Sequence, residues 1–202
     1  MKTGFVKGLF LSIFLLAMGF SPPLGAEPVA LEHLKTSLAS LQQVLTDPKL
    51  AGDEHLSQRR KLVRAVLQQL FDFQEMSRRS LGANARRYKD RLGEFTPLFV
   101  DFLEHSYMGV LEKNGDAKIQ YLKEILDGEN LQVSTKTRLK DGSEYSVDYK
   151  LYLSQTGWRV YDVIVENVSL VNNYRSQFDR ALKKKSFDAL LQDLREKREA
   201  FN

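Results

Sequence analysis

The three histidines are the first candidates for acid–base or metal chemistry in this chain. His33, His55 and His105 fall on three different predicted helices, and their spacing matches neither HxxxH nor HExxH. The sequence also has no GxSxG nucleophile motif, no glycine-rich phosphate loop and no acidic calcium loop. This pattern is typical of solvated or helix-capping histidines, so we expect no metal site.

Carboxylates on predicted strands are the other candidates for catalysis. They are Glu144, Asp148, Asp162 and Glu166. Two carboxylates on one sheet face could act as a general acid and a general base, with Asp148 or Asp162 as a buried base. A solvated sheet face explains them more simply, because side chains alternate between the two faces of a strand. We therefore expect no catalytic residue, and the enzyme stays an alternative.

Apolar and aromatic side chains are more numerous than candidate catalytic groups. Val133, Tyr145 and Tyr149 project from one face of the predicted sheet, and Phe99 and Phe102 lie on a helix that could cover it. Such residues either fill a core or line a cleft for an apolar ligand. Periodicity alone does not separate a filled core from a hollow one.

The elements that position these residues begin with helices, because apolar residues in the N-terminal half repeat at steps of three and four. The predicted helices cover residues 31–45, 53–70, 73–81 and 94–113. Asp72 is the expected N-cap of the third helix, and Gly82 is expected to end it.

From Leu131 the apolar period changes to two, which indicates strands. Residues 131–139 and 144–153 form a predicted hairpin around an Asp-Gly turn, and residues 158–166 form the next strand. The segment KIQYLKEIL, residues 118–126, fits a strand or a helix, and we expect an earlier strand. Two closing helices follow, over residues 174–184 and 186–201, the second with Ser186 as its N-cap.

These elements predict an α+β fold with a helical N-terminal half, a curved antiparallel meander of about four strands and two C-terminal helices. We expect an NTF2-like cone with a helical annex. The helical part would span residues 31–113, the sheet residues 117–167 and the closing helices residues 172–201.

Residues 1–26 have the pattern of a secretory signal peptide. Lys2 and Lys7 precede the apolar core of this segment, and PLGA follows it, so cleavage is expected after Ala26. The apolar core is shorter than the roughly 20 residues that a membrane-spanning helix needs. We expect residues 27–202 to form one exported, soluble domain.

Cysteine content and charge exclude several classes of protein. The chain has no cysteine, which excludes disulfides and thiolate metal sites. Its formal net charge of +4 includes Lys2 and Lys7, so acids and bases nearly balance in the rest and nucleic acid is not an expected partner. LKKKS, residues 182–186, either complements a helix dipole or contacts anionic lipid headgroups or an acidic partner.

Three longer motifs carry a family resemblance. WRVYDVIVENVSLVNNYRSQF, residues 158–178, combines a tryptophan, a YD pair, an apolar strand, a VSLV corner and a Tyr-Arg helix start. In this order it resembles the signature of the MlaC, or toluene-tolerance, family. FDFQEMSRRSLG (71–82) and FVDFLEHSYMGVL (99–111) are similar to two other motifs of that family. After Gly82 the family has a tryptophan and a Thr-x-x-Gln-like helix start, whereas this chain has ANARRYKDRL, which we expect to alter a docking surface more than a ligand cavity.

The resemblance implies a non-catalytic periplasmic phospholipid carrier of the Mla pathway, with the acyl chains between sheet and helices and with bound phospholipid as ligand rather than a cofactor. It implies docking to an outer-membrane lipoprotein complex and to the substrate-binding ring of an inner-membrane ABC transporter, and we expect a monomer. A hopanoid or another polycyclic lipid is the second expected ligand. A structural envelope protein with a filled core remains a further alternative.

The residues expected to bind lipid are apolar or aromatic and lie on the long helix, the strands and the corner after the last strand. They are Phe99, Phe102, Leu103, Tyr107, Val133, Tyr145, Val147, Tyr149, Val163, Val165, Val168, Leu170 and Tyr174. At the corner we expect Val168, Leu170 and Val171 to pack at the edge of the cavity, with Asn172 or Asn173 as helix cap. Tyr174 and Arg175 are expected near its mouth.

Overall fold

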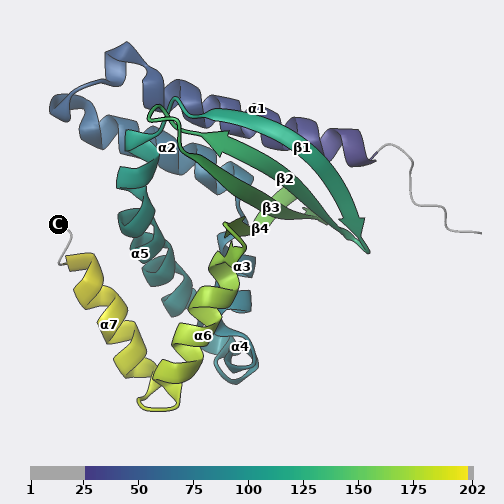
Figure 1. The fold of residues 1–202 in the computed structure, drawn as a ribbon. Helices are drawn as coiled ribbons and strands as arrows, with labels where there is room; N and C mark the ends of the chain where they lie inside the picture. Colours follow the sequence, from purple (N-terminus) through teal and green to yellow (C-terminus); the bar gives the residue numbers. More distant parts are fainter. Residues whose placement is uncertain (1–25, 200–202) are drawn as a thin grey trace, which may run out of the picture.

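The computed structural model describes residues 26–199, so the predicted signal peptide, apart from Ala26, lies outside the described residues (Figure 1). The first half of the described chain is helical. Its helices are α1 (Ala26–Thr46), α2 (Leu56–Leu70), α3 (Phe73–Leu81), α4 (Asn84–Arg87) and α5 (Leu92–Lys113), with short 3-10 turns at Pro48–Leu50, Asp53–His55 and Lys89–Arg91. The predicted caps of α3 are confirmed: Asp72 accepts a hydrogen bond from the Glu75 N–H at 2.8 Å, and Gly82 ends the helix at a φ of 56°.

An antiparallel meander follows, in the strand order β1-β2-β3-β4-β5. The strands are β1 (Lys118–Asp127), β2 (Asn130–Arg138), β3 (Glu144–Ser154), β4 (Gly157–Val165) and β5 (Val168–Ser169). KIQYLKEIL lies within β1, so the expected strand is confirmed. A register shift between Tyr121 and Lys123 interrupts its alternation, which explains why the same sequence also fits a helix.

Two helices close the chain, α6 (Leu170–Leu182) and α7 (Phe187–Glu199). The Ser186 hydroxyl accepts a hydrogen bond from the Ala189 N–H at 3.2 Å, which confirms its predicted capping role. The α+β fold with a meander between helical parts is confirmed. The structure adds β5, a two-residue strand that the apolar pattern does not indicate.

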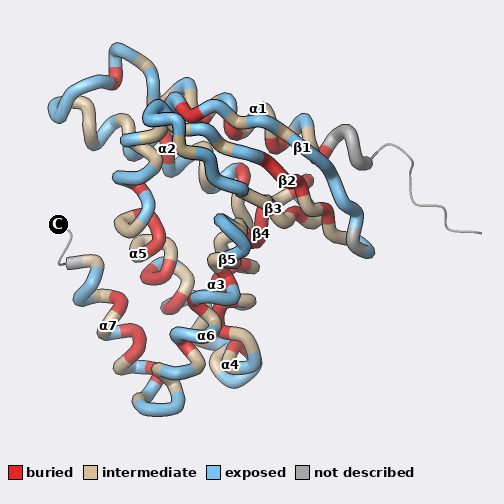
Figure 2. The backbone as a smooth tube through the Cα atoms, viewed as in Figure 1, coloured by how far each residue is buried: buried red, intermediate tan, exposed pale blue. Residues whose placement is uncertain are grey.

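One apolar cluster, which we call the sheet cluster, lies between the sheet and α1. Leu34 and Leu38 of α1 pack with Val133, Tyr149 and Leu151 of β2 and β3. Figure 1 shows α1 running along the sheet, and Figure 2 shows buried residues on both. The full set of buried members is Ala30, Leu34, Leu38, Leu70, Leu131, Val133, Tyr149, Leu151, Trp158 and Val160.

A second cluster, the helical cluster, lies among α3, α5, α6 and α7. Its centre is aromatic: the rings of Phe95 and Phe99 stack at 5.5 Å, and Phe178 meets both edge-on at 5.3 Å. The buried members are Met76, Leu81, Ala85, Phe95, Leu98, Phe99, Leu103, Val171, Tyr174, Phe178, Phe187, Leu190, Leu191 and Leu194. Aromatic pairs of this kind add to the stabilisation that burial alone gives.

Phe71, between α2 and α3, joins the two clusters. Its half-buried side chain packs against both of them, and its backbone forms a parallel bridge to Val160 of β4. The next N–H, of Asp72, donates to the Val160 carbonyl at 2.9 Å. The helical half is therefore fixed to the sheet by backbone hydrogen bonds at this point.

Candidate functional site

The predicted lipid-binding residues of the sheet are neighbours in the strand register. Tyr149 of β3 lies opposite Val133 of β2 on one side and Val163 of β4 on the other. Two residues along β3, on the same face, Val147 lies opposite Val165. Tyr145 is the next residue of β3 on that face, so the register places these side chains on one face of three neighbouring strands.

The corner after β4 continues this surface toward the helices. Val165 pairs with Val168 of β5 across a tight turn, and the turn residues Glu166 and Asn167 have φ angles of 48° and 63°. The Glu166 carboxylate also accepts a hydrogen bond from the Ser146 N–H at 2.5 Å. Left-handed residues of this kind form the two-residue turns that join antiparallel strands, so the chain reverses here without glycine or proline.

Asp162 fixes the helix start that follows the corner. Its buried carboxylate accepts hydrogen bonds from the Ser169 hydroxyl at 2.6 Å and from the Val171 N–H at 3.0 Å. Ser169 is the N-cap, since its hydroxyl accepts from the Asn172 N–H at 3.0 Å. The prediction that Asn172 or Asn173 caps this helix is therefore wrong, because α6 begins earlier, at Leu170, and both asparagines lie inside it.

The helical members of the predicted site meet at Tyr174. This residue lies one turn after Leu170 on α6, and its ring meets Phe99 edge-on at 5.2 Å and Phe102 edge-on at 5.6 Å. Its hydroxyl lies 3.4 Å from the Tyr107 hydroxyl of α5. Leu103, buried in the helical cluster, lies one turn from both Phe99 and Tyr107 on α5.

Strand register, ring contacts and spacing along the chain link the predicted lining residues in a series, which we call the apolar seam. It runs from Val133, Tyr149, Val163, Val147, Tyr145, Val165 and Val168 to Leu170, Tyr174, Tyr107, Leu103, Phe99 and Phe102. Its ends are buried in the sheet and helical clusters, whereas its middle is exposed: Tyr107 by 39%, Tyr145 by 41%, Val165 by 43% and Val168 by 60%. The expectation that Val168 packs at the corner is wrong, because its side chain faces solvent.

One further residue belongs with the exposed middle. Val110 lies one turn after Tyr107 on α5 and is 58% exposed. The prediction from sequence omits it, although its spacing of three residues from Tyr107 places it on the same side of the helix. Arg175, in contrast, points toward α3, where its Nε donates to the Arg79 carbonyl at 2.9 Å.

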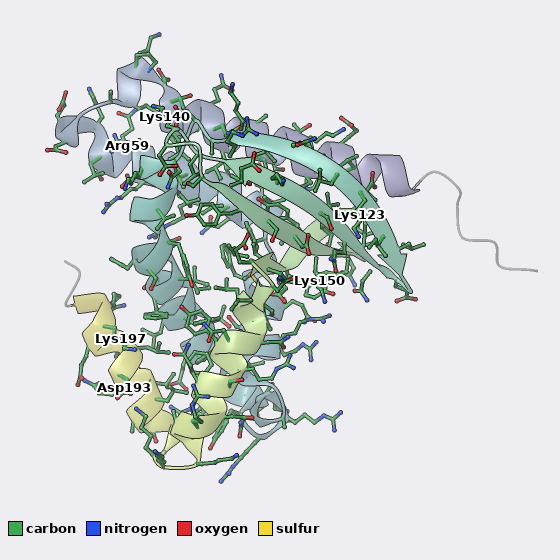
Figure 3. The ribbon with its side chains drawn as sticks, in the orientation of Figure 1. Arg59, Lys123, Lys140, Lys150, Asp193 and Lys197 are labelled. Atoms are coloured by element: carbon green, nitrogen blue, oxygen red, sulfur yellow. The ribbon has the colours of Figure 1, made fainter. Side chains whose placement is uncertain are left out.

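A pocket of about 100 Å³ adjoins the helical end of the seam. It lies among α5, α6 and α7 and is lined by Phe102, Tyr174, Gln177, Phe178, Ala181, Leu190, Asp193, Leu194 and Lys197. Lys197 lies over the Phe102 ring at 5.1 Å, and Asp193 forms an ion pair with Lys185. Figure 3 labels Lys197 and Asp193 on α7. Pockets for drug-sized ligands measure about 300–1,000 Å³, so this one would have to widen to admit an acyl chain.

A second pocket, of about 200 Å³, lies away from the predicted residues. It is formed by the end of α1, the turns before α2, and Arg59 and Glu112, which form an ion pair at 3.4 Å. None of the seam residues lines it. Its charged wall is unsuited to an acyl chain.

Burial affects the tyrosines of the seam. It raises the pKa of the Tyr149 hydroxyl well above its ordinary range, and burial together with the Tyr107 contact does the same for the pKa of Tyr174. Both phenols therefore stay neutral at physiological pH. None of the seam members is an aspartate, glutamate, lysine or arginine, which suits contact with hydrocarbon chains.

The carboxylates considered for catalysis have structural partners. Asp162 is held by the corner, and Asp148 accepts a hydrogen bond from the Gln132 side chain at 2.9 Å. Within residues 26–199, no group of three or more histidine and carboxylate side chains is placed to hold a metal ion. No helix in the same range is both long enough and apolar enough to cross a membrane.

Comparisons with known proteins bear on this geometry. A search of curated proteins finds no match. By fold, the chain is similar to a solved structure described as the phospholipid-binding protein from Ralstonia solanacearum in complex with a phospholipid. The TM-score is 0.76 at 22% sequence identity, and the similarity covers 85% of this chain and 98% of that one. The family model described as MlaC protein matches residues 35–196, and the chain therefore belongs to the MlaC family.

Proposed function

We propose that this chain is a soluble periplasmic carrier that binds the acyl chains of a phospholipid along the apolar seam. The observation that carries this proposal is that strand register and side-chain contacts link the predicted lining residues, of which four are exposed while those at the sheet and helical ends are buried. Contiguous exposed apolar side chains mark ligand or partner sites on soluble proteins. Membership of the MlaC family and the likeness in fold to a phospholipid-binding protein support a lipid as the occupant.

A carrier of this kind lowers the free-energy cost of moving a phospholipid through water. Transfer of two acyl chains with about 30 methylenes into water costs on the order of 24 kcal/mol, at about 0.8 kcal/mol for each methylene. A protein surface that covers the chains removes most of this cost. Because the seam and a bilayer are both apolar, lipid exchange between them can be near balance, and docked partners would set its direction.

The wider role follows from the family. We propose that residues 1–26 direct export, that residues 27–202 act as one lipid-binding domain, and that the protein shuttles lipid without catalysing a reaction. Its partners would be an outer-membrane lipoprotein complex and the substrate-binding ring of an inner-membrane ABC transporter. No step of this role needs a cofactor, since the proposed work is binding and release.

Native mass spectrometry of the purified chain tests the proposal. We expect a mass increase that corresponds to a phospholipid, and extraction should identify its headgroup and chains. A preparation without lipid should gain the same mass after incubation with phospholipid vesicles. A chain that is free of lipid and takes up none from vesicles would contradict the proposal and favour a structural protein with a filled core. A bound polycyclic lipid would contradict the phospholipid assignment while keeping the seam as the site.

A further inference from the structure

A basic surface lies at the end of the molecule that is farthest from the sheet. It consists of residues 84–91, which form α4 and the turn after it, and residues 180–188, which join α6 to α7. We call these two segments the basic tip. Figure 1 shows α4 and the α6–α7 connection together at the lower end, opposite the sheet.

Contacts between the two segments and their neighbours hold the tip in shape. The Asn84 side chain donates to the Asp179 carboxylate of α6 at 2.7 Å. The rings of Tyr88 and Phe187 stack with centroids 4.1 Å apart, and Arg91 forms an ion pair with Asp188 at 2.7 Å. The basic side chains are therefore carried on an ordered frame.

The tip concentrates positive charge in a chain that is otherwise slightly acidic. It holds eight of the 30 basic residues and two of the 26 acidic ones, a net charge of +6. Lys2 and Lys7 lie before residue 26, so the rest of the described chain holds 20 basic and 24 acidic residues, a net charge of −4. The small net charge of the whole chain is therefore the sum of a basic tip and a slightly acidic remainder.

Most of these charges form no ion pair in the described part of the chain. Arg91 is paired with Glu94 and Asp188, and Lys185 with Asp193. Within residues 26–199, the other basic residues of the tip form no ion pair; they are Arg86, Arg87, Lys89, Arg180, Lys183 and Lys184. All six are exposed. Two acidic residues close to these six in sequence also form no ion pair within residues 26–199. They are Asp90, which is exposed, and Asp179, whose carboxylate accepts a hydrogen bond from Asn84.

The surface chemistry of the tip decides between a membrane and a protein partner. Protein interfaces depend on a few large apolar or aromatic anchors that fill pockets. None of the large apolar side chains exposed in the described part of the chain lies in residues 84–91 or 180–188. A basic surface without such anchors fits a layer of anionic headgroups, which attracts lysine and arginine without insertion.

We propose that the basic tip binds the surface of membranes that contain anionic phospholipids. This goes beyond lipid carriage, because the contact would be made by the tip and not by the seam. It would hold the carrier beside a bilayer reversibly, at a place that the seam leaves free. Each basic residue near an anionic surface strengthens binding about fivefold, and salt weakens the attraction.

Vesicle sedimentation of the full mature chain tests this proposal. The tip variant is R86Q/K89Q/K183Q/K184Q. The matched control is K61Q/K113Q/K118Q/K123Q, which removes the same charge from exposed lysines on α2, α5 and β1 that form no ion pair in the described range. Both variants are compared with the wild type on vesicles with and without phosphatidylglycerol, at low and high salt, and thermal unfolding checks that each is folded.

The wild type should bind vesicles that contain phosphatidylglycerol, release them at high salt, and bind pure phosphatidylcholine vesicles weakly. The tip variant should lose affinity by about fivefold for each charge removed, whereas the control should stay within about twofold of wild type. Equal binding by the tip variant and the wild type would overturn the proposal, as would equal binding to both vesicle types. Reduced capture of a protein partner with unchanged vesicle binding would also overturn it and assign the tip to that partner.

The proposals for the seam and for the tip can be tested separately. Native mass spectrometry of the tip variant should still show bound phospholipid, because none of the substituted residues belongs to the seam. A wild-type chain that binds anionic vesicles but carries no lipid would leave the membrane contact intact and contradict lipid carriage.

Discussion

The sheet end and the helical end of the apolar seam are both buried, but different forces hold them. At the sheet end, Val133, Tyr149 and Val163 lie on strands joined by backbone hydrogen bonds. At the helical end, Phe99 and Tyr174 meet through ring contacts between separate helices. Separation of neighbouring strands leaves buried backbone groups unpaired, whereas helices that pack through side chains can slide without that cost. We therefore expect space for an acyl chain to open more readily among the helices than within the sheet.

The position of the small pocket agrees with this difference. The pocket of about 100 Å³ lies among α5, α6 and α7, next to Phe102 and Tyr174. An acyl chain that covers the exposed middle of the seam could extend into it if α7 moves away from α5. The sheet end would then act as a fixed wall, and the helical end would adjust to the length of the chain.

The largest expected effect tests the helical end. Phe99→Ala removes the ring that contacts Phe95, Tyr174 and Phe178, so it should lower the free energy of unfolding by about 4 kcal/mol. Urea unfolding measures the loss. Val110→Ala on the exposed side of the same helix is the control, with an expected change within about 0.5 kcal/mol. Similar losses for both would show that the aromatic cluster does not hold the helices together.

The next effect tests the corner that joins the two ends. Asp162→Ala leaves the Ser169 hydroxyl and the Val171 N–H without their acceptor, so we expect a loss of about 2–3 kcal/mol in unfolding free energy. Asp148→Ala is the matched control, because this half-buried carboxylate accepts one hydrogen bond from Gln132, and its expected loss is below about 1 kcal/mol.

The same pair of variants separates a structural role from a catalytic one. Lipid binding by the folded fraction should persist in both, since neither carboxylate belongs to the seam. Loss of function in a stable Asp148→Ala protein would instead favour the enzyme that the sequence left open.

A third variant tests the exposed middle of the seam. Val168→Asp places a charge where the acyl chains are proposed to lie, so bound lipid should fall at least about tenfold while the unfolding free energy stays within about 0.5 kcal/mol. Lipid extraction and urea unfolding give the two values. Leu153→Asp is the control: Leu153 is on the same sheet and 59% exposed, but it lies outside the seam. An equal loss of lipid in the control would show that the seam is not the site.

The smallest expected effect is on the pH dependence of stability, and it compares the two ends of the seam through Tyr149 and Tyr174. The unfolded chain ionises its tyrosines above about pH 10, while burial keeps Tyr149 and Tyr174 neutral in the folded state. Their contribution to stability is complete below that pH and is lost as the pH rises. Tyr149→Phe and Tyr174→Phe should each reduce the loss above pH 10 by about 1.4 kcal/mol per pH unit. Urea unfolding across this range measures the slopes, and slopes equal to that of wild type would contradict the burial of these hydroxyls.

Much of this architecture follows from local rules of sequence. The period of three and four predicts the helices, Asp72 and Gly82 predict the caps of α3, and the alternation from Leu131 predicts the hairpin. The corner after β4 is harder to predict, because the residues that fix it are distant in sequence and its strand is very short. Asp162 accepts hydrogen bonds from Ser169 and Val171, which are seven and nine residues away in the chain, and β5 spans two residues. Ser169 and Asn172 are both good capping residues, and the hydrogen bond from the Ser169 hydroxyl to Asp162 favours Ser169 as the cap.

The faces on which the seam residues lie were easier to predict than the exposure of these residues. Alternation and helical spacing place apolar residues on one face, but they do not show how much of that face another element covers. Val133 is fully buried under α1, whereas Val165, with the same residue type on the same face, is 43% exposed. That difference depends on where α1 and α5 lie, which is a property of the whole fold.

Crosslinking with a phospholipid that carries a photoactivatable group on an acyl chain tests the central claim most directly. The mature chain would be loaded with this lipid and irradiated, and the modified residues would be mapped by mass spectrometry. We predict that the crosslinks fall on Tyr107, Val110, Tyr145, Val165 and Val168, in the exposed middle of the seam. Crosslinks concentrated instead on the exposed Leu122, Ile125 and Leu126 of β1 would contradict the account, because these apolar residues lie outside the seam.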